Sequence, residues 1–232
     1  VASGGMVNSV VVENDGQYEA VEGMGADRDP ATLSKQEIRD IVKAAGIVGM
    51  GGAGFPTNVK LDTSKLEEKP DTLIVNGSEC EPYLTSDHRI MVENAEQIVD
   101  GIVLAMKASG VSCAKVGIED NKPDAIAAMR EAASDKQNVE VVSLPARYPQ
   151  GFEKTLIYSL TGRIVPNGKL PSAAKCVVMN VGTCAALSAA VRKGQPLIDR
   201  VVTVTGRVAK PTNFRVRIGT PLLDLIDQVG GL

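Results

Sequence analysis

Residues 72–89 read TLIVNGSECEPYLTSDHR: a short apolar run, a glycine and an acidic loop that leads into a helical pattern. The helical pattern extends over about residues 88–108, and the apolar run AKVGIE follows at residues 114–119. A second helical pattern, residues 121–134, leads to the run VEVVSL at residues 139–144. Short apolar strands that alternate with amphipathic helices are typical of a parallel sheet covered on both faces. The sequence therefore predicts an α/β fold with a mostly parallel sheet.

Further elements are predicted on both sides of this series. Residues 34–46 carry a capping box, Ser34 with Glu37, before apolar positions at helical spacing and a terminating glycine. A helical stretch begins at residue 153, and CVVMNVG at residues 176–182 predicts one more buried strand before another helix.

Three segments differ in pattern. Residues 1–27 contain an alternating run around Asp15-Gly16, which predicts a hairpin over residues 6–22, the tail of an N-terminal β module. Residues 28–196 hold the α/β series. Residues 197–232 combine two alternating strands with a short amphipathic helix, which indicates a second, smaller unit.

Composition excludes several classes of function. Hydrophobic residues make up 44% of the chain, yet no apolar run approaches the roughly 20 residues of a membrane span, so we expect no direct membrane insertion. A net charge of -3 and 3% aromatic residues argue against nucleic acid as a partner. The four cysteines lack C-x-x-C spacing and His88 is the single histidine, so no metal site is predicted.

The stretch GMGGAGFPTNVKL, residues 49–61, contains the pattern G-x-G-x-x-G. A dinucleotide-binding turn must follow a strand and open a long helix, whereas here a capped helix precedes the glycines and Pro56 follows them. Two interpretations remain open. The glycines either permit tight packing alone, or they bring backbone N–H groups close to an anion or a flat polar ring, with Lys60 available as a point charge.

Polar side chains gather after the first strand. Asn76, Glu79, Glu81 and Asp87 lie at or beyond its carboxyl end, where ligands bind in open α/β sheets. A solvated acidic loop with Asp87 as the N-cap of the next helix is the alternative interpretation. No nucleophile and base pair is evident and His88 is assigned no role, so we expect no catalytic side chain and leave the chemistry to a cofactor.

Four stretches together carry a family resemblance: GMGGAGFPTNVKL, VNGSECEPYLTSDHRIMVEN, YPQGFEKTLIYSLTGRIVP and VVMNVGTCAALSAAVRKGQPLIDRVVTVTG. In this order they resemble the C subunit of the Rnf electron-transport complex and, more distantly, the flavin-bearing NADH-oxidising subunit of respiratory complex I. The resemblance implies a Rossmann-like FMN/NADH-binding domain, followed by the start of a β-grasp (soluble-ligand-binding) domain. It also implies hydride transfer between NADH and FMN in an ion-translocating NAD:ferredoxin oxidoreductase.

The resemblance also implies site residues by matched position. The NADH side would comprise Phe55, Glu81 and Glu153. The FMN side would comprise Gly49, Gly51, Gly52, Lys60, Asn76, Glu79, Tyr148, Gly151, Asn180 and Thr183.

The same resemblance implies partners and a location. The chain would be peripheral on the cytoplasmic side of the cell membrane and would contact other subunits of a membrane-bound Rnf-type complex. Iron-sulfur clusters would belong to a cluster-binding domain that is absent from these residues.

Three positions depart from the relatives. The complex I relatives have arginine at the position of Met50, aspartate at that of Ser78 and glutamate at that of Phe152, and Phe152 also replaces a small residue usual in the Rnf protein. Two alternative functions therefore stay open. One is a related soluble electron-transfer protein of an amino-acid reductase system, and the other is a cofactor-free scaffold that docks partners.

Overall fold

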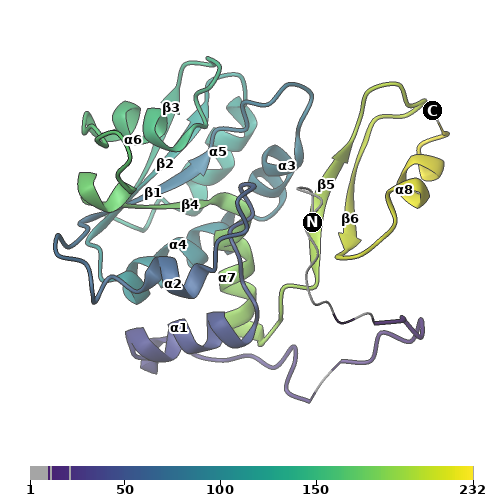
Figure 1. The fold of residues 1–232 in the computed structure, drawn as a ribbon, viewed down its shortest axis with the longest axis horizontal. Coiled ribbons are helices and arrows are strands. Elements are labelled where there is room, and N and C mark those ends of the chain that lie inside the picture. The colour runs from purple at the N-terminus through teal and green to yellow at the C-terminus, as the bar shows by residue number, and fades with distance from the viewer. Residues whose placement is uncertain (1–9, 11, 21, 232) are drawn as a thin grey trace.

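A four-stranded parallel sheet forms the centre of the molecule (Figure 1). The computed structural model describes residues 10, 12–20 and 22–231. The strands are β1 (Thr72–Gly77), β2 (Cys113–Glu119), β3 (Val139–Leu144) and β4 (Cys176–Asn180), in the order β3-β2-β1-β4. The chain therefore builds outward from β1 to β3 and then returns to the other side of β1. The predicted α/β class with a mainly parallel sheet is confirmed.

The apolar strands bury side chains on both faces of the sheet. Leu73 and Val75 of β1 belong to a large core, whereas Ile74 between them belongs to a smaller core on the opposite face. Because successive side chains of a strand point to opposite faces, the continuous apolar run of β1 serves both cores.

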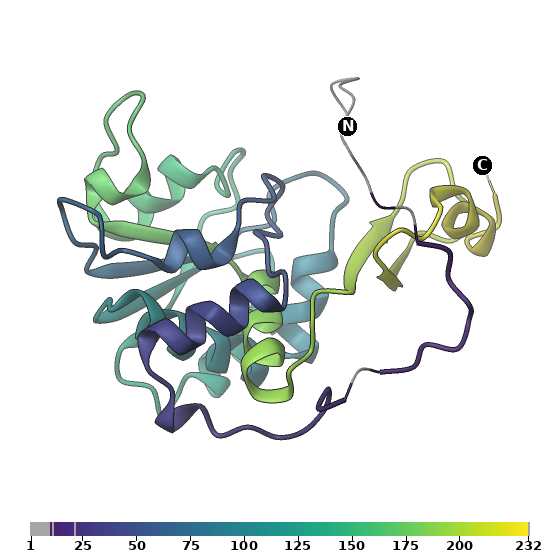
Figure 2. The same ribbon diagram turned by 60° about the horizontal axis from the view of Figure 1, so that its bottom comes forward.

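Helices cover the two faces unequally (Figures 1 and 2). The smaller core is closed by α6 (Glu153–Thr161) and by the segment that follows it. The larger core lies under a layer of longer helices. These are α1 (Lys35–Ala44), α3 (Ser86–Glu93), α4 (Ala95–Ser109), α5 (Pro123–Ala132) and α7 (Val181–Lys193), with the short α2 (Thr57–Leu61) beside them. Two 3-10 turns, Pro30–Thr32 and Pro171–Ala174, complete the elements of this part.

Local sequence signals account for several helix ends. Ser34 accepts the N–H of Glu37, and the Glu37 carboxylate accepts the N–H of Ser34, so the capping box predicted for α1 is confirmed.

The helix predicted over residues 88–108 is broken at Asn94, which separates α3 from α4. The prediction of Asp87 as N-cap is wrong, because Thr85 takes that position and Asp87 lies inside the first turn.

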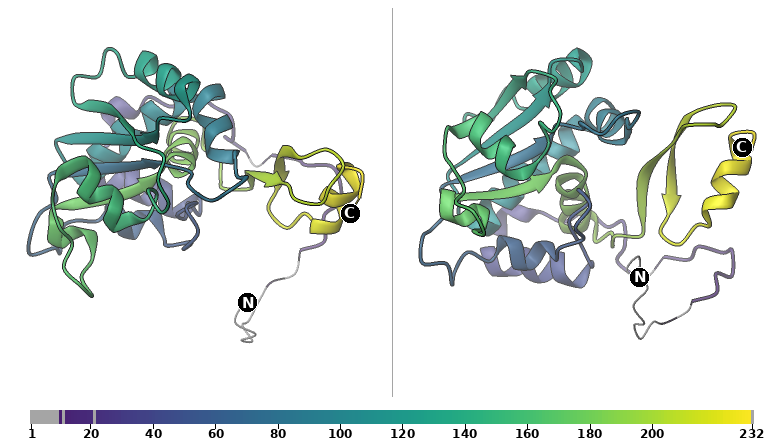
Figure 3. Two further views of the ribbon diagram at one scale, coloured as in Figure 1. Left: turned by 90° about the horizontal axis from the view of Figure 1, so that it is seen from above. Right: turned by 45° about the horizontal axis from the view of Figure 1, so that its top comes forward.

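A smaller unit follows the sheet domain. β5 (Asp199–Val204) and β6 (Thr212–Arg217) pair as an antiparallel hairpin, and α8 (Leu222–Gln228) is the last of the described helices. Figure 3 shows this unit beside the sheet domain, joined to it through the short segment between α7 and β5. The predicted second unit of two strands and a helix is therefore present.

The hairpin predicted over residues 6–22 falls partly outside the described residues, namely at 6–9, 11 and 21. Residues 10, 12–20 and 22 form no strand, although the chain bends at Gly16. A two-stranded hairpin is marginal without a further strand or helix to pack on, and residues 12–20 are exposed.

Gly101 lets α4 and α7 approach closely. A Cβ atom at this position would lie 1.9 Å from the backbone oxygen of Cys184 on α7. Because that neighbour is backbone rather than a flexible side chain, the clash could be relieved only by moving one helix.

We therefore expect Gly101→Ala to lower the free energy of unfolding by about 1–3 kcal/mol in urea denaturation, despite the higher helix propensity of alanine. Val103→Ala, on the exposed side of the same helix, should change it by less than about 0.5 kcal/mol. A Gly101→Ala variant as stable as the parent would contradict this account of the helix contact.

Candidate functional site

The candidate site lies where the strand order reverses. Asn76 and Asn180 are register partners at the carboxyl ends of β1 and β4, and a cavity of about 310 Å³ opens beside them. Reversal of strand order creates the crevice in which open α/β sheets bind ligands. The lining residues are Gly49, Gly51, Ala53, Phe55, Thr57, Lys60, Asn76, Gly151, Phe152, Glu153, Val178, Met179, Asn180 and Thr183.

The glycine loop, residues 49–56, forms one wall of the cavity. Its ends are held by backbone bonds: Gly49 N–H donates to the Phe55 oxygen at 2.8 Å. Gly52 and Gly54 have φ of +118° and +62°, which residues with a Cβ atom rarely adopt. The loop leads into the five-residue α2 rather than a long helix, so the prediction that it is not an ordinary dinucleotide turn is confirmed.

Donors in this wall are available to a ligand. Within the described part of the chain, no hydrogen bond uses the N–H groups of Gly51, Gly52 or Ala53. Lys60 Nζ donates to the Val178 oxygen at 2.9 Å, which fixes the ammonium group at the cavity wall and leaves further N–H donors on it. A positive charge beside free backbone amides suits an anionic or oxygen-rich ligand.

Asn180 connects three parts of the site. Its Oδ1 accepts the N–H of Gly182 at 2.8 Å and of Thr183 at 3.3 Å, which caps α7, while its Nδ2 donates to Asp87 Oδ2 at 2.6 Å. Thr183 in turn accepts the N–H of Met50 at 2.9 Å. The glycine loop, the start of α7 and the start of α3 are therefore held by one hydrogen-bond chain.

The carboxyl group of Asp87 is the most perturbed acid of the site. Burial, with a further contribution from the nearby Glu79 carboxylate, raises its pKa to about 6. The Asn180 bond and the charges of Arg200 and Lys122 act in the opposite direction.

Glu79 caps α3. Its carboxylate accepts the hydroxyl of Ser86 and the N–H groups of Asp87 and His88 at 2.9–3.1 Å. An acidic group at a helix N-terminus is stabilised by the free amides and by the helix dipole. Glu79 therefore fixes the acidic loop, residues 78–85 between β1 and α3, and does not line the cavity.

A second cavity of about 450 Å³ lies beyond the acidic loop, and Glu79, Glu81 and Tyr148 line it. The Tyr148 hydroxyl donates to Glu81 Oε1 at 3.3 Å, and the charge of that carboxylate raises the pKa of the tyrosine. Glu81 and Tyr148 therefore lie together, on a different wall from the glycine loop.

Gly151 is required by close backbone contact. A Cβ atom here would lie 2.2 Å from the Ser78 oxygen, and the Gly151 oxygen accepts the Asn76 side-chain amide at 2.9 Å. The loop after β3 is thereby held against the end of β1. Phe152, which follows, is 55% exposed and lines the cavity without closing it.

The structure brings most of the predicted site residues together. The predicted residues that line the cavity are Gly49, Gly51, Phe55, Lys60, Asn76, Gly151, Glu153, Asn180 and Thr183. Gly52, Glu79, Glu81 and Tyr148 do not line it, and their predicted ligand contacts stay predictions. Sequence reasoning missed Ala53, Thr57, Val178 and Met179, because apolar and small residues give no chemical signal until the fold places them.

Comparisons with known proteins agree with this architecture. The family model described as Nuo51 FMN-binding domain matches residues 42–189, which include the whole parallel sheet and every residue lining the first cavity. The chain belongs to the Nuo51 FMN-binding domain family. A second model, the SLBB domain, matches residues 201–232, so the predicted β-grasp unit after the α/β domain is confirmed.

The resemblance to the C subunit of the Rnf complex is also confirmed. The chain is 52% identical over 228 residues to the C subunit of the proton-translocating ferredoxin:NAD(+) oxidoreductase complex of Clostridium ljungdahlii. It is 47% identical over 240 residues to the C subunit of the Na(+)-translocating ferredoxin:NAD(+) oxidoreductase complex of Acetobacterium woodii. The alignments cover 98% and 99% of this chain, which spans about half the length of these relatives, 50% and 52%.

A solved structure shares the fold. A chain of the NAD+-reducing [NiFe]-hydrogenase in the air-oxidized state superposes with a TM-score of 0.73 at 26% identity, covering 86% of this chain and 39% of that one. In the part of the chain that the structure describes, no helix is both long enough and apolar enough to cross a membrane.

Asp87 makes stability depend on pH in a testable way. Because the pKa of Asp87 is raised to about 6 in the folded state, the folded chain binds a proton that the unfolded chain releases between about pH 4 and 6. This carboxyl group therefore destabilises the fold above pH 6, and its penalty disappears as the pH falls toward 4. We expect Asp87→Asn to be more stable than the parent by up to about 3 kcal/mol at pH 8, with a difference that shrinks at pH 4.5.

Urea unfolding at these two pH values measures the difference. Asp124→Asn serves as a control of opposite sign, because the His88 hydrogen bond lowers the pKa of Asp124, so this exposed carboxylate stabilises the fold at both pH values. If the free energy of unfolding of Asp87→Asn and of the parent changed equally between the two pH values, the raised pKa of Asp87 would be contradicted.

Proposed function

We propose that the cavity at the ends of β1 and β4 binds FMN and that NADH reduces the bound FMN. The chain would then be the NADH-oxidising module of an ion-translocating ferredoxin:NAD+ oxidoreductase complex of the Rnf type. One observation carries the proposal. A cavity with free glycine amides and a lysine ammonium group lies wholly within the span that matches the Nuo51 FMN-binding domain.

The residues present fit a flavin mononucleotide. The cavity of about 310 Å³ lies at the lower end of the range of small-molecule sites and is open to solvent on the side of Phe55 and Phe152. Lys60 and the amides of Gly51 and Ala53 supply charge and donors for a phosphate or for ring oxygens. The side chains of Asn76 and Asn180 are already oriented by Gly151 and by α7.

Phe55, Glu153 and Glu81 are the residues we assign to NADH. Phe55 is 46% exposed at the cavity rim, where its ring offers a face to a second planar group. Glu153 lines the same cavity and Glu81 is held by Tyr148 on the adjoining loop. Both carboxylates are able to accept hydrogen bonds from the hydroxyl groups of a ribose.

When bound, FMN supplies the chemistry, because it takes a hydride from NADH and releases electrons singly. The protein's part is to hold the two groups in place and to limit the motion of the loops around them. In this proposal Glu79 acts indirectly, since it fixes the acidic loop by capping α3. Tyr148 acts by orienting Glu81.

The proposal extends to location and partners. The names of the relatives identify them as subunits of ion-translocating oxidoreductase complexes. We infer that this chain acts at the cytoplasmic side of the membrane as a peripheral part of such a complex. Electrons would leave toward iron-sulfur clusters held outside these residues.

Reconstitution tests the function directly. The purified chain is titrated with FMN, and binding is followed by quenching of flavin fluorescence; NADH is then added without oxygen. Flavin absorbance that bleaches on addition of NADH supports the proposal. A colourless chain that cannot be reconstituted would overturn it and favour the scaffold function, whereas bound flavin unaffected by NADH would leave only the FMN site.

Lys60 provides a sharper test of where the phosphate lies. We expect Lys60→Met to weaken FMN binding roughly 10- to 100-fold, because one charge-assisted contact with the phosphate is lost. Riboflavin, which has no phosphate, should bind the variant and the parent within about twofold.

Lys65→Met is the matched control, since Lys65 is exposed on the segment after α2 and does not line the cavity. Equal loss of FMN and riboflavin binding in Lys60→Met would show that Lys60 contacts the ring or supports the cavity wall through Val178 rather than binding phosphate.

A further inference from the structure

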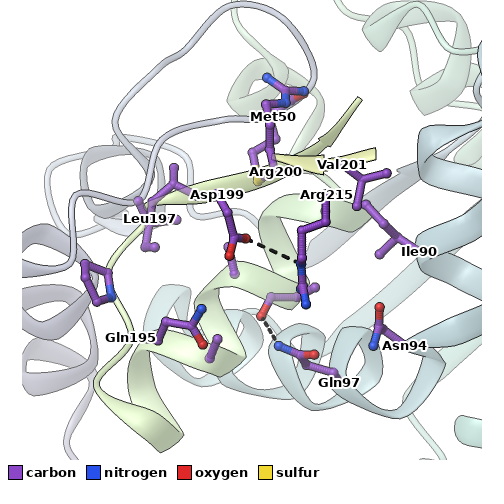
Figure 4. A pocket seen from close by; sticks show the side chains of 16 residues that line it. Met50, Ile90, Asn94, Gln97, Gln195, Leu197, Asp199, Arg200, Val201 and Arg215 are labelled. Carbon is purple, nitrogen blue, oxygen red and sulfur yellow. Dashed lines mark hydrogen bonds and ion pairs between the residues drawn. The ribbon is translucent and has the colours of Figure 1, made fainter. Parts of the chain in front are cut away.

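The β5–β6 hairpin contacts the glycine loop. Arg200 on β5 donates from Nη2 to the backbone oxygen of Met50 at 3.2 Å. Figure 4 shows Arg200 and Met50 side by side at the rim of a small pocket between the two units. The N–H of the same Met50 is held by Thr183 at 2.9 Å. Both backbone polar groups of Met50 are therefore fixed, one by the sheet domain and one by the hairpin.

The hairpin also contacts the acidic loop. Thr203 Oγ1 on β5 accepts the N–H of Thr85 at 3.2 Å and donates to Asn213 Oδ1 on β6 at 2.7 Å. Asn213 Nδ2 donates to Thr85 Oγ1 at 2.9 Å and to the Thr85 oxygen at 3.3 Å. Thr85 is the N-cap residue of α3, whose next residues bind the Glu79 carboxylate. The hairpin is thus bonded to Thr85, where the acidic loop meets α3.

The interface between hairpin and sheet domain combines polar and apolar side chains. The pocket beneath the contact has a volume of about 70 Å³, and Asp199 and Arg215 of the hairpin approach each other to 3.6 Å across it (Figure 4). On the opposite side Gln97 donates to the backbone oxygen of Ala185 at 3.0 Å. Apolar side chains contribute as well, because Leu197 and Val201 pack against the larger core.

We propose that the β5–β6 hairpin positions both loops of the cofactor site, with Arg200 as the positioning residue of the glycine loop and the Thr203–Asn213 pair as that of the acidic loop. The proposal rests on the proposed function for the identity of the ligand, FMN. Arg200 does not line the cavity, so it acts through Met50 and not on the ligand.

Backbone entropy gives the physical reason. Four of the six residues from Gly49 to Gly54 are glycines, which lose more conformational freedom on ordering than other residues. Fixing Met50 at both its N–H and its oxygen removes part of that freedom before a ligand arrives, and preorganisation of this kind increases affinity.

The charge of Arg200 supplies a second connection. It favours the ionised form of Asp87, against the burial and the Glu79 charge that raise the pKa of that carboxyl. Lys122 on the β2–α5 side acts in the same direction as Arg200. Asp87 is bonded to Asn180 of the cavity wall, so the hairpin and the site share this group as well.

The coupling must be reciprocal. If an ordered hairpin strengthens FMN binding, bound FMN stabilises the docking of the hairpin by the same factor. We therefore expect hydrogen exchange at β5 and β6 to slow when FMN is added.

The test uses the 232-residue chain and three variants: Arg200→Ala, Arg200→Lys and the double variant Thr203→Val with Asn213→Ala. FMN affinity is measured by fluorescence titration, and amide exchange is measured without FMN. We expect Arg200→Ala to weaken FMN roughly three- to tenfold and to speed exchange of the Met50 N–H, with partial recovery in Arg200→Lys. The double variant should speed exchange at residues 85–88. Arg207→Ala, in the exposed β5–β6 connection, is the control and should match the parent.

The outcomes separate the two proposals. A parent chain that fails to bind FMN overturns the proposed function, while the exchange of the Met50 and Thr85 amides still tests the positioning. A parent that binds FMN, together with an Arg200→Ala variant of equal affinity and equal Met50 exchange, overturns the positioning role alone. Weaker FMN binding without faster Met50 exchange also overturns it, because Arg200 would then act by charge alone.

Discussion

The parallel pairing of β1 with both β2 and β4 is the constraint on which the rest of the structure depends. Thr72 is the register partner of Cys113 on one side and of Cys176 on the other, so the three strands end at nearly the same level. The chain adds β2 and β3 on one side of β1 and then returns to place β4 on the other side. The crevice above β1 and β4 follows from this order, because no crossover covers it.

The walls of that crevice combine the ends of β1 and β4 with two loops and the starts of neighbouring helices. The glycine loop reaches it before β1, and the loop at Gly151 follows β3. Each loop is fixed by a hydrogen bond to a backbone oxygen: the Gly49 N–H donates to Phe55, and the Asn76 side-chain amide donates to Gly151. Glycine is needed where backbones approach closely: a Cβ atom at position 151 would lie only 2.2 Å from the Ser78 oxygen. Rigid anchoring of short loops on a sheet gives a binding site its geometry.

Charge in the site is arranged by helix ends. Glu79 and Asn180 satisfy the first amides of α3 and α7, and the two caps meet because Asn180 also donates to Asp87. Desolvation of Asp87 and the charge of the neighbouring Glu79 carboxylate raise its pKa, against the Asn180 hydrogen bond, and that bond ties the two helices to each other. The β5–β6 hairpin adds polar contacts to the same region through Met50 and Thr85.

Sequence alone determined the alternating strands and helices, the capping box of α1, the departure of the glycine loop from a dinucleotide turn, and the family. These features are local, since apolar periodicity, caps and motifs are encoded within a few adjacent residues. Tertiary structure alone decided that Glu79 caps α3, that Asn94 breaks the predicted helix, and that Glu81 and Tyr148 lie on a different wall from Lys60. It also decided which apolar residues line the cavity and that Arg200 reaches Met50, 150 residues earlier in the chain. The physical reason is that burial and pairing depend on neighbours brought together by strand order, and residue spacing along the chain does not specify those neighbours.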